Sequence, residues 1–363
     1  MRKRMLSQDI AKGLAILVVV QLHSLQPSEM LYYVLAVLLG FAMPFFIFMS
    51  GYNYRSKGLT PVQNMKKRVL MILKVFACWT IGIFLVMGAY FLIRGDGTPA
   101  EILRSFAGFL LSESGCKMIG WELPTALFQH VLAPLWYLQY LVTASVLFYL
   151  TVDCALRSLK YAFSLVFLGL AVTFVLVAFN VYLPWGLHCA PALAAIMITG
   201  AVLGQENRFF TAATTTAWKV VNTLICLAVT TAIQYSWPSA GLLGAGNLGE
   251  VAGSVEVLFL FCFGVFGSWF LIHIGMLLEK VPVLSKGLIW LGQHTLIILC
   301  LHRPVAYVIR DLMGLPHFIA GSYTDVMTGE NIIAFLLVFV VMIPVILLVD
   351  RIKKKRSVRQ SAS

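Results

Sequence analysis

Three ionisable side chains, Asp9, Lys12 and His23, accompany the first apolar run of the chain, which reads DIAKGLAILVVVQLH. In a helix with about 100° per residue, the interval from Lys12 to His23 makes roughly three full turns, so both side chains project from one face about 16 Å apart along the axis. Asp9 shares this face, one turn before Lys12. A lysine can bind an anion, and an imidazole can accept a proton near neutral pH. The spacing therefore predicts an anionic ligand at one end of the helix and general-base chemistry at the other.

A purely structural interpretation of these residues also exists. The long side chain of Lys12 can reach the polar boundary of a membrane, and His23 can be a packed interior histidine. Ionisable residues inside a membrane span are costly, however, and they usually face the interior of a helix bundle. Because Asp9, Lys12 and His23 share one face of the helix, we interpret them as a functional stripe and not as a chance placement.

The elements that carry this stripe are expected to be membrane helices. Of the 363 residues, 60% are hydrophobic and 12% are charged, and the mean hydropathy is +0.89. A soluble domain is about 45–50% apolar and about 25% charged. Since a helical span takes about 20 apolar residues, we predict an all-α, polytopic membrane protein with about ten transmembrane helices. Their expected positions are 10–26, 31–53, 69–93, 133–155, 161–182, 189–205, 218–237, 255–278, 287–309 and 331–350.

One transmembrane domain is predicted over residues 1–350, followed by a basic cytoplasmic tail over residues 351–363. Most of the 27 lysines and arginines fall in segments on the side of the two termini, and the positive-inside rule assigns that side to the cytoplasm. We therefore expect a protein of the cell membrane (the inner or plasma membrane) with both termini cytoplasmic. Segment 94–132 becomes a long outer loop, and the tail becomes a disordered end facing lipid headgroups.

Other classes of partner and cofactor are disfavoured. The net charge of +12 gathers at the ends of apolar segments, and no basic face is interleaved with aromatic residues, so no nucleic acid is expected. The G-x-G-x-x-G pattern at 244–249 follows no strand and predicts no dinucleotide site. The histidines lack metal-ligand spacing, so no metal is expected. Cys116 and Cys189 fall in predicted outer loops and can pair, although their positions alone do not decide it.

Five segments, taken in order along the chain, resemble the acyltransferase 3 family of membrane O-acyltransferases. They are Asp9–His23, Pro44–Tyr52, Lys66–Arg68, Leu135–Leu138 and Leu291–Val305. The family typically shows an arginine or lysine, ten residues, and then a histidine in its first span. The lysine at Lys12 is most similar to the branch related to fucose and polysaccharide O-acetylases. Met71 stands where the family often has a second arginine, three residues after the one matched by Arg68.

The resemblance implies transfer of an acyl group, acetyl by default, from cytosolic acyl-CoA to a hydroxyl of an envelope glycan or lipid-linked sugar. Acyl-CoA would be a co-substrate, and no permanently bound cofactor is expected. The implied catalytic residues are His23 as general base, with Lys12 and Asp9. Cationic side chains suit the donor phosphates, and the implied donor-binding residues are Arg68, Lys67, Lys66 and Lys12. The implied acceptor-binding residues are His302, Arg303, Gln21, Trp136 and Tyr137.

Two functions of other classes remain as alternatives. The first is a transporter or flippase for a lipid-linked sugar, with the buried charges lining its path. Transporters often show broken helices in two repeated halves, and no such repeat is visible in the sequence. The second is a membrane sensor that binds acyl-CoA without turnover. Trp136 and Tyr137 have an alternative of their own, because aromatic residues commonly form belts at the ends of spans.

Overall fold

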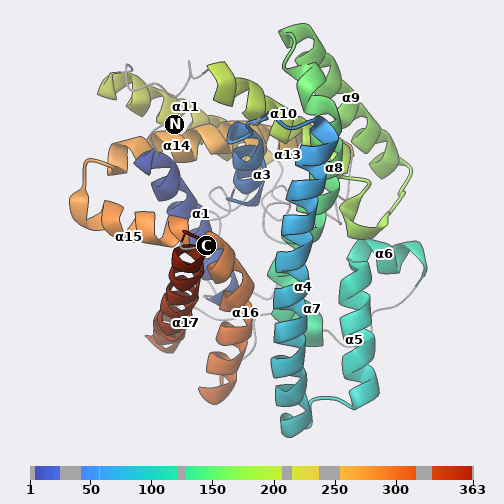
Figure 1. Ribbon diagram of the computed structural model, residues 1–363, viewed down its shortest axis with the longest axis vertical. Coiled ribbons are helices and arrows are strands. Elements are labelled where there is room, and N and C mark those ends of the chain that lie inside the picture. Colours follow the sequence, from blue (N-terminus) through green and yellow to red (C-terminus); the bar gives the residue numbers. More distant parts are fainter. Residues whose placement is uncertain are drawn as a thin grey trace.

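The computed structural model describes residues 5–24, 42–56, 58–120, 127–206, 215–236, 254–315 and 329–361, and these ranges contain helices and no strand. The all-α prediction is therefore confirmed (Figure 1). The elements are α1 (Leu6–Ser24), α3 (Ala42–Tyr52), α4 (Pro61–Arg94), α5 (Pro99–Leu111), α6 (Glu113–Met118), α7 (Leu127–Leu132), η1 (Ala133–Leu135), α8 (Trp136–Ala155), α9 (Leu159–Ala178), η2 (Pro184–Gly186), α10 (Ala190–Glu206), α11 (Thr216–Ser236), α13 (Ser254–Cys262), the π-helical η4 (Phe263–Gly267), α14 (Ser268–Leu278), α15 (Pro282–Gln293), α16 (Thr295–Leu312) and α17 (Gly329–Ser361).

Six helical stretches among the described residues are long and apolar enough to cross a membrane, and a seventh is added if α15 and α16 count as one span. The chain is thus a multi-pass membrane protein. The count of ten spans and the side of each terminus stay predictions. Part of the expected second span, residues 31–41, lies outside the described residues. The expected disorder of the tail is wrong, because α17 continues as a helix to Ser361; its cytoplasmic side stays a prediction.

Local signals in the sequence explain where α4 begins and ends. Thr60 caps its first turn by accepting from the backbone N–H of Gln63, whose side chain accepts in return from the backbone of Thr60. This reciprocal capping box satisfies two otherwise unpaired donors. Pro61 occupies the first turn, where it loses no hydrogen bond, and Gly95 ends the helix with a left-handed conformation. As a result α4 starts earlier than the predicted span at 69–93.

The expected outer loop at 94–132 is largely helical. α5 begins with a second capping box between Thr98 and Glu101 and then runs back along α4. The rings of Phe106 and Phe84 stack with centroids 4.0 Å apart, and Phe109 stacks on Phe76 at 6.1 Å. The two helices are therefore antiparallel neighbours, as Figure 1 also shows.

The predicted ninth span, 287–309, is not one straight helix. α15 and α16 meet at an angle of 83°, and His294 occupies the break with non-helical backbone angles. Its ring bonds the carbonyl oxygen of Trp290 at 2.7 Å and the carboxylate of Asp350 on α17 at 2.6 Å. Hydropathy does not register such a break, since the residues on both sides are apolar.

Helix α1 lies inside the bundle, where it contacts α3, α14, α15, α16 and α17. Two glycines, on α15 and α3, permit neighbouring helices to pack closely. A Cβ atom on Gly292 would meet the backbone of Asp9 in α1, and one on Gly51 at the end of α3 would meet the backbone of Met197 in α10. The backbones of α1 and α15 can therefore approach closely because Gly292 has no side chain, and Gly13 of α1 does the same against the backbone of Leu288.

We expect Gly292→Ala to lower the midpoint temperature of thermal unfolding in detergent. Overpacking typically reduces the free energy of unfolding by about 1–3 kcal/mol. Gly287→Ala in the same helix is the matched control, because a Cβ there meets nothing within 4 Å. Alanine in an exposed helical position is about 1 kcal/mol more favourable than glycine, so this control should unfold at the native temperature or above. Equal midpoints for the two variants would contradict the close packing of α1 on α15.

Candidate functional site

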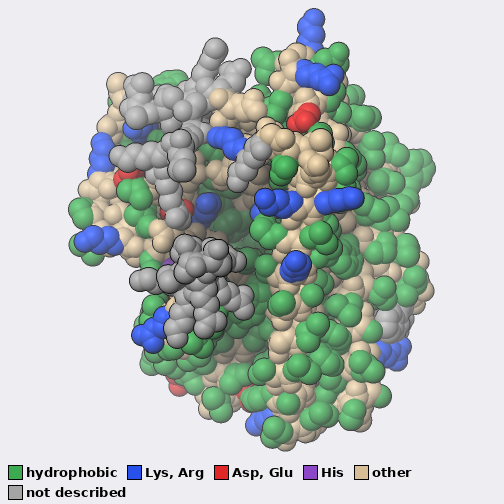
Figure 2. Space-filling view, viewed as in Figure 1, with side chains coloured by type: hydrophobic (Ala, Val, Ile, Leu, Met, Phe, Trp, Pro, Cys, Tyr) green, Lys and Arg blue, Asp and Glu red, His purple; other side chains and the backbone are tan. Residues whose placement is uncertain are grey.

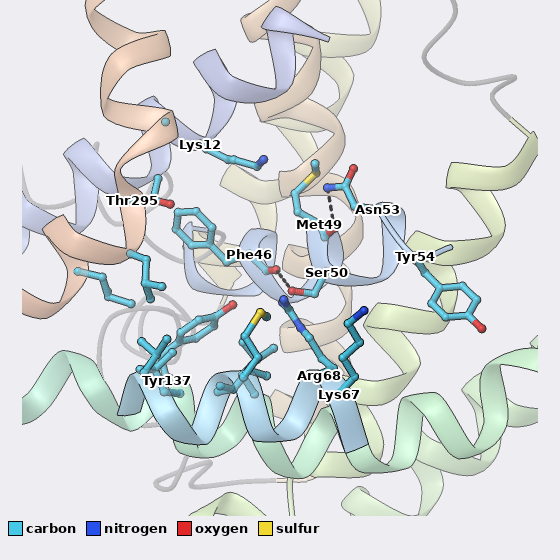
Figure 3. Close-up of a pocket in the computed structure, with 18 of the residues that line it drawn as sticks. Lys12, Phe46, Met49, Ser50, Asn53, Tyr54, Lys67, Arg68, Tyr137 and Thr295 are labelled. Atoms are coloured by element: carbon cyan, nitrogen blue, oxygen red, sulfur yellow. Dashed lines mark hydrogen bonds between the residues drawn. The ribbon is translucent and has the colours of Figure 1, made fainter. Parts of the chain in front are cut away.

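A cavity of about 680 Å³ opens between α1, α3, α4, α8 and the break between α15 and α16. Lysine and arginine side chains surround the hollow beside α4 (Figure 2). Four cationic residues line it, namely Lys12 from α1, Arg55 after α3, and Lys67 and Arg68 from α4. In the close-up, Lys12 and Arg68 approach the space from opposite sides (Figure 3). The cavity can therefore take an anionic ligand that bridges α1 and α4.

The acid and base at the start of the stripe lie together at this cavity. Asp9 is 2% exposed, and one of its carboxylate oxygens is 3.7 Å from Nζ of Lys12. Both residues line the cavity, as does Ile16 one turn further along α1. The buried carboxylate of Asp9 is thus balanced by a lysine that still faces the cavity.

The predicted cationic cluster of α4 is only partly at the cavity. Lys67 and Arg68 line it, whereas Lys66 is exposed and is not among its lining residues. Met71, which replaces the second arginine of the family pattern, also lines it. Arg55 contributes a cation that the sequence interpretation missed, although its place just after the Pro44–Tyr52 segment was a signal.

Of the predicted acceptor residues Gln21, Trp136 and Tyr137, only Tyr137 lines the cavity. The charge of Arg68 and the side chain of Ser50 both act on its hydroxyl. Trp136 is not among the lining residues and packs edge-on against Tyr140, with ring centroids 5.2 Å apart. Gln21, half-buried near the end of α1, does not line the cavity either.

A second cavity of about 520 Å³ adjoins the first and shares Tyr54 and Arg55 with it. The hydroxyl of Tyr54 donates to a carboxylate oxygen of Asp153 at 2.9 Å. Burial, together with this bond, raises the pKa of Tyr54 above its ordinary value. The hydroxyl therefore stays protonated, so a neutral phenol lines both cavities.

At the far end of α1, three predicted residues lie together. The imidazoles of His23 and His302 stack with ring centroids 5.3 Å apart and an interplanar angle of 27°. His302 is fully buried, and Arg303 beside it is also buried. Electrostatic interactions join Arg303 to both rings. Since Ile16 is the last α1 residue that lines the cavity, His23 lies about two helical turns beyond the cavity.

A buried arginine holds the end of α1 just after His23. Nη1 of Arg310 donates to Oδ1 of Asn331 at 2.9 Å and to the backbone oxygen of Ser24 at 3.4 Å. All three residues are buried. A cation at a helix C-terminus satisfies its last carbonyls and complements the helix dipole. Arg310 thus links α1, α16 and α17 at the level of the two histidines.

We expect Arg310→Met to destabilise the protein by about 1–3 kcal/mol, because buried groups that lose a partner cost that much. Thermal unfolding in detergent measures the effect. Arg94→Met is the matched control, since Arg94 pairs with the neighbouring Asp311 at 2.9 Å but its side chain is 52% exposed. Exposed pairs contribute about 0–1 kcal/mol. A larger loss from Arg94→Met than from Arg310→Met would show that Arg310 does not hold the helix end.

The two cysteines whose pairing the sequence left open are both buried. Sγ of Cys116 donates to the backbone oxygen of Gly108 at 3.4 Å, within the α5–α6 region. Neither cysteine lines the cationic cavity or belongs to the stacked histidine pair.

A family model described as an acyltransferase domain, that of the acyltransferase 3 family, matches residues 6–351 of this chain. The match includes the cationic cavity and the histidine pair, and it confirms the resemblance read from the five ordered segments. No curated protein and no solved structure matches the chain.

Proposed function

This chain belongs to the acyltransferase 3 family and is a membrane acyltransferase, and from that premise we propose that its donor is cytosolic acyl-CoA, with acetyl as the default acyl group. The proposed acceptor is a hydroxyl of an envelope glycan or lipid-linked sugar. One observation carries the proposal. A single helix, α1, joins a cationic cavity to a stacked pair of histidines. Such an arrangement suits acyl-CoA, which has anionic phosphates at one end and a reactive thioester at the other.

The donor would lie along this helix. Its phosphates would meet Arg68, Lys67, Arg55 and Lys12, because phosphates favour charge-assisted hydrogen bonds. Its thioester arm would pass the apolar part of the cavity, whose lining includes Ile16 and Leu299. With both termini in the cytoplasm, as the distribution of lysine and arginine predicts, the cationic end opens to cytosolic acyl-CoA.

The proposed chemistry requires one base and no cofactor of its own. His23 takes the proton of the acceptor hydroxyl as its oxygen attacks the thioester carbonyl. Arg303, buried beside the histidines, stabilises the negative charge that develops on the carbonyl oxygen. When the carbon–sulfur bond breaks, the CoA thiolate leaves and takes the proton back from the His23 imidazolium. The products are the acylated hydroxyl and CoA as its thiol.

Turnover tests the proposal directly. The purified protein in detergent is given acetyl-CoA labelled in the acetyl group, with a panel of envelope glycans and lipid-linked sugars. We expect label on the acceptor and one CoA released for each acyl group transferred. Binding of acetyl-CoA without release of CoA would favour the sensor alternative. If neither occurs, but the protein moves a lipid-linked sugar across a vesicle membrane, the transporter alternative takes its place.

A further inference from the structure

Two nitrogen atoms in the histidine pair are buried and have no hydrogen-bond partner among the described residues. They are Nδ1 of His23 and Nε2 of His302. A buried polar atom without a partner costs about 1–3 kcal/mol, and such atoms in folded proteins call for an explanation. These two belong to imidazoles that stack on each other, so each ring offers the other a nearby partner.

The hydrogen bonds of His302 fix which of its nitrogens carries the proton. Nδ1 of His302 lies 2.9 Å from the backbone oxygen of Ile298. A carbonyl oxygen can only accept, so Nδ1 must donate. In a neutral imidazole the other nitrogen then carries a lone pair. Nε2 of His302 is therefore a buried acceptor that needs a donor.

Another histidine shows what complete pairing looks like in this protein. His273 on α14 is as buried as His302, and its Nδ1 bonds the backbone oxygen of Trp269, also four residues earlier, at 2.9 Å. Its Nε2 accepts from the indole N–H of Trp269 at 3.3 Å. Both ring nitrogens of His273 are thus satisfied, as expected of a histidine with a packing role. His302 has the first bond and lacks the second.

We propose that His302 is a positioning residue whose Nε2 accepts a hydrogen bond from Nδ1–H of His23 and so selects the tautomer in which Nε2 of His23 is the base. A third group that orients a catalytic base is a general arrangement in enzymes. The inference rests on the proposed function for the identity of the base. It adds the atom of His23 that reacts and the residue that holds it.

The two rings need only a small adjustment to meet. Stacked rings do not place one nitrogen in the plane of the other, so either a rotation of the His23 ring or one bridging water joins them. A water in such a place is plausible when two polar partners are present, and these two nitrogens supply them. During transfer the proton moves from the acceptor hydroxyl to Nε2 of His23 and then to the CoA sulfur. His302 gains no proton at any step.

The charges around the pair are compatible with this role. Arg303 acts on both rings, and Arg310 lies at the end of α1. Both are cations, so a negative charge on the reacting carbonyl oxygen is favoured there, while His302 serves as a neutral acceptor. A carboxylate in the place of His302 would instead pair with these cations.

Two substitutions of His302 separate positioning from packing. His302→Gln keeps an acceptor oxygen for His23 and an N–H for Ile298, whereas His302→Leu fills the space and offers neither. We expect His302→Leu to lower kcat by about 10²–10⁴, a range typical of base catalysis, with an unchanged KM for acetyl-CoA. His302→Gln should recover activity to within about tenfold of native. His273→Leu is the matched control and should keep the native kcat.

A readout independent of turnover tests the same inference. With ¹⁵N-labelled histidine, nuclear magnetic resonance shifts show which nitrogen of His23 carries the proton, and His23→Gln assigns its signals. We expect Nδ1–H in the native protein and a loss of that preference in His302→Leu. Native kcat in His302→Leu would overturn the proposal. So would equal losses in both His302 variants, or an Nε2–H tautomer in the native protein. If native protein transfers no acyl group, the proposed function fails, while the shifts still decide the tautomer.

Discussion

Replacement of His23 by alanine should lower the rate of acyl transfer by about 10²–10⁴, because that is what a positioned general base contributes. His23 is the ionisable residue of the α1 stripe that lies beyond the cationic cavity, next to His302 and Arg303. Affinity for acetyl-CoA should change little, since Lys12 is about three turns away along α1 and the other proposed phosphate ligands line the cavity, which His23 does not. The measurement is label transfer at saturating donor, together with a binding titration of acetyl-CoA.

The control for this variant is His273→Ala, which removes a buried histidine of α14 that does not line the cavity. It should transfer acyl groups at the native rate per folded molecule, so a general effect of histidine loss is separated from loss of the base. A native rate in His23→Ala would show that another group takes the proton. A loss of donor binding equal to the loss of rate would instead place His23 in the donor site.

The parts of the site that sequence could predict were those governed by helical spacing. Asp9 and Lys12 are three residues apart, and the ion pair between them follows from one helical turn. The order of the family segments also points to Arg68, His23 and His302 without any knowledge of their contacts. What spacing could not supply was the contact between distant segments, such as the stacking of His23 on His302, because tertiary packing decides it.

The errors have equally definite causes. The break at His294 was missed because an apolar run continues on both sides of it, while a bond to Asp350 on another helix accompanies the bend. α5 was missed because its 13 residues are too short for a span. The capping pattern of Thr98, Pro99 and Glu101 was nevertheless a readable start signal. The charge of the tail suggests disorder, although lysine and arginine are good helix formers.

Arg68→Gln should raise the KM for acetyl-CoA by about 10–100-fold, the equivalent of the 1.5–3 kcal/mol that a hydrogen bond to a charged group contributes. Arg68 lines the cationic cavity opposite Lys12, and Met71 stands where the family pattern often adds a second arginine. Fewer cations then share the donor phosphates, so each matters more. We expect kcat at saturating donor and the KM for the acceptor to stay near native.

Lys66→Gln is the matched control for Arg68→Gln, because it removes the same charge from the same helix but from an exposed residue that does not line the cavity. It should alter the KM for acetyl-CoA by less than about twofold at physiological salt, where exposed charges are screened beyond about 8 Å. Equal effects of the two variants would mean that the overall charge of α4 attracts the donor and that Arg68 makes no direct contact. A change in acceptor choice with an unchanged donor KM would move Arg68 to the acceptor side of the reaction.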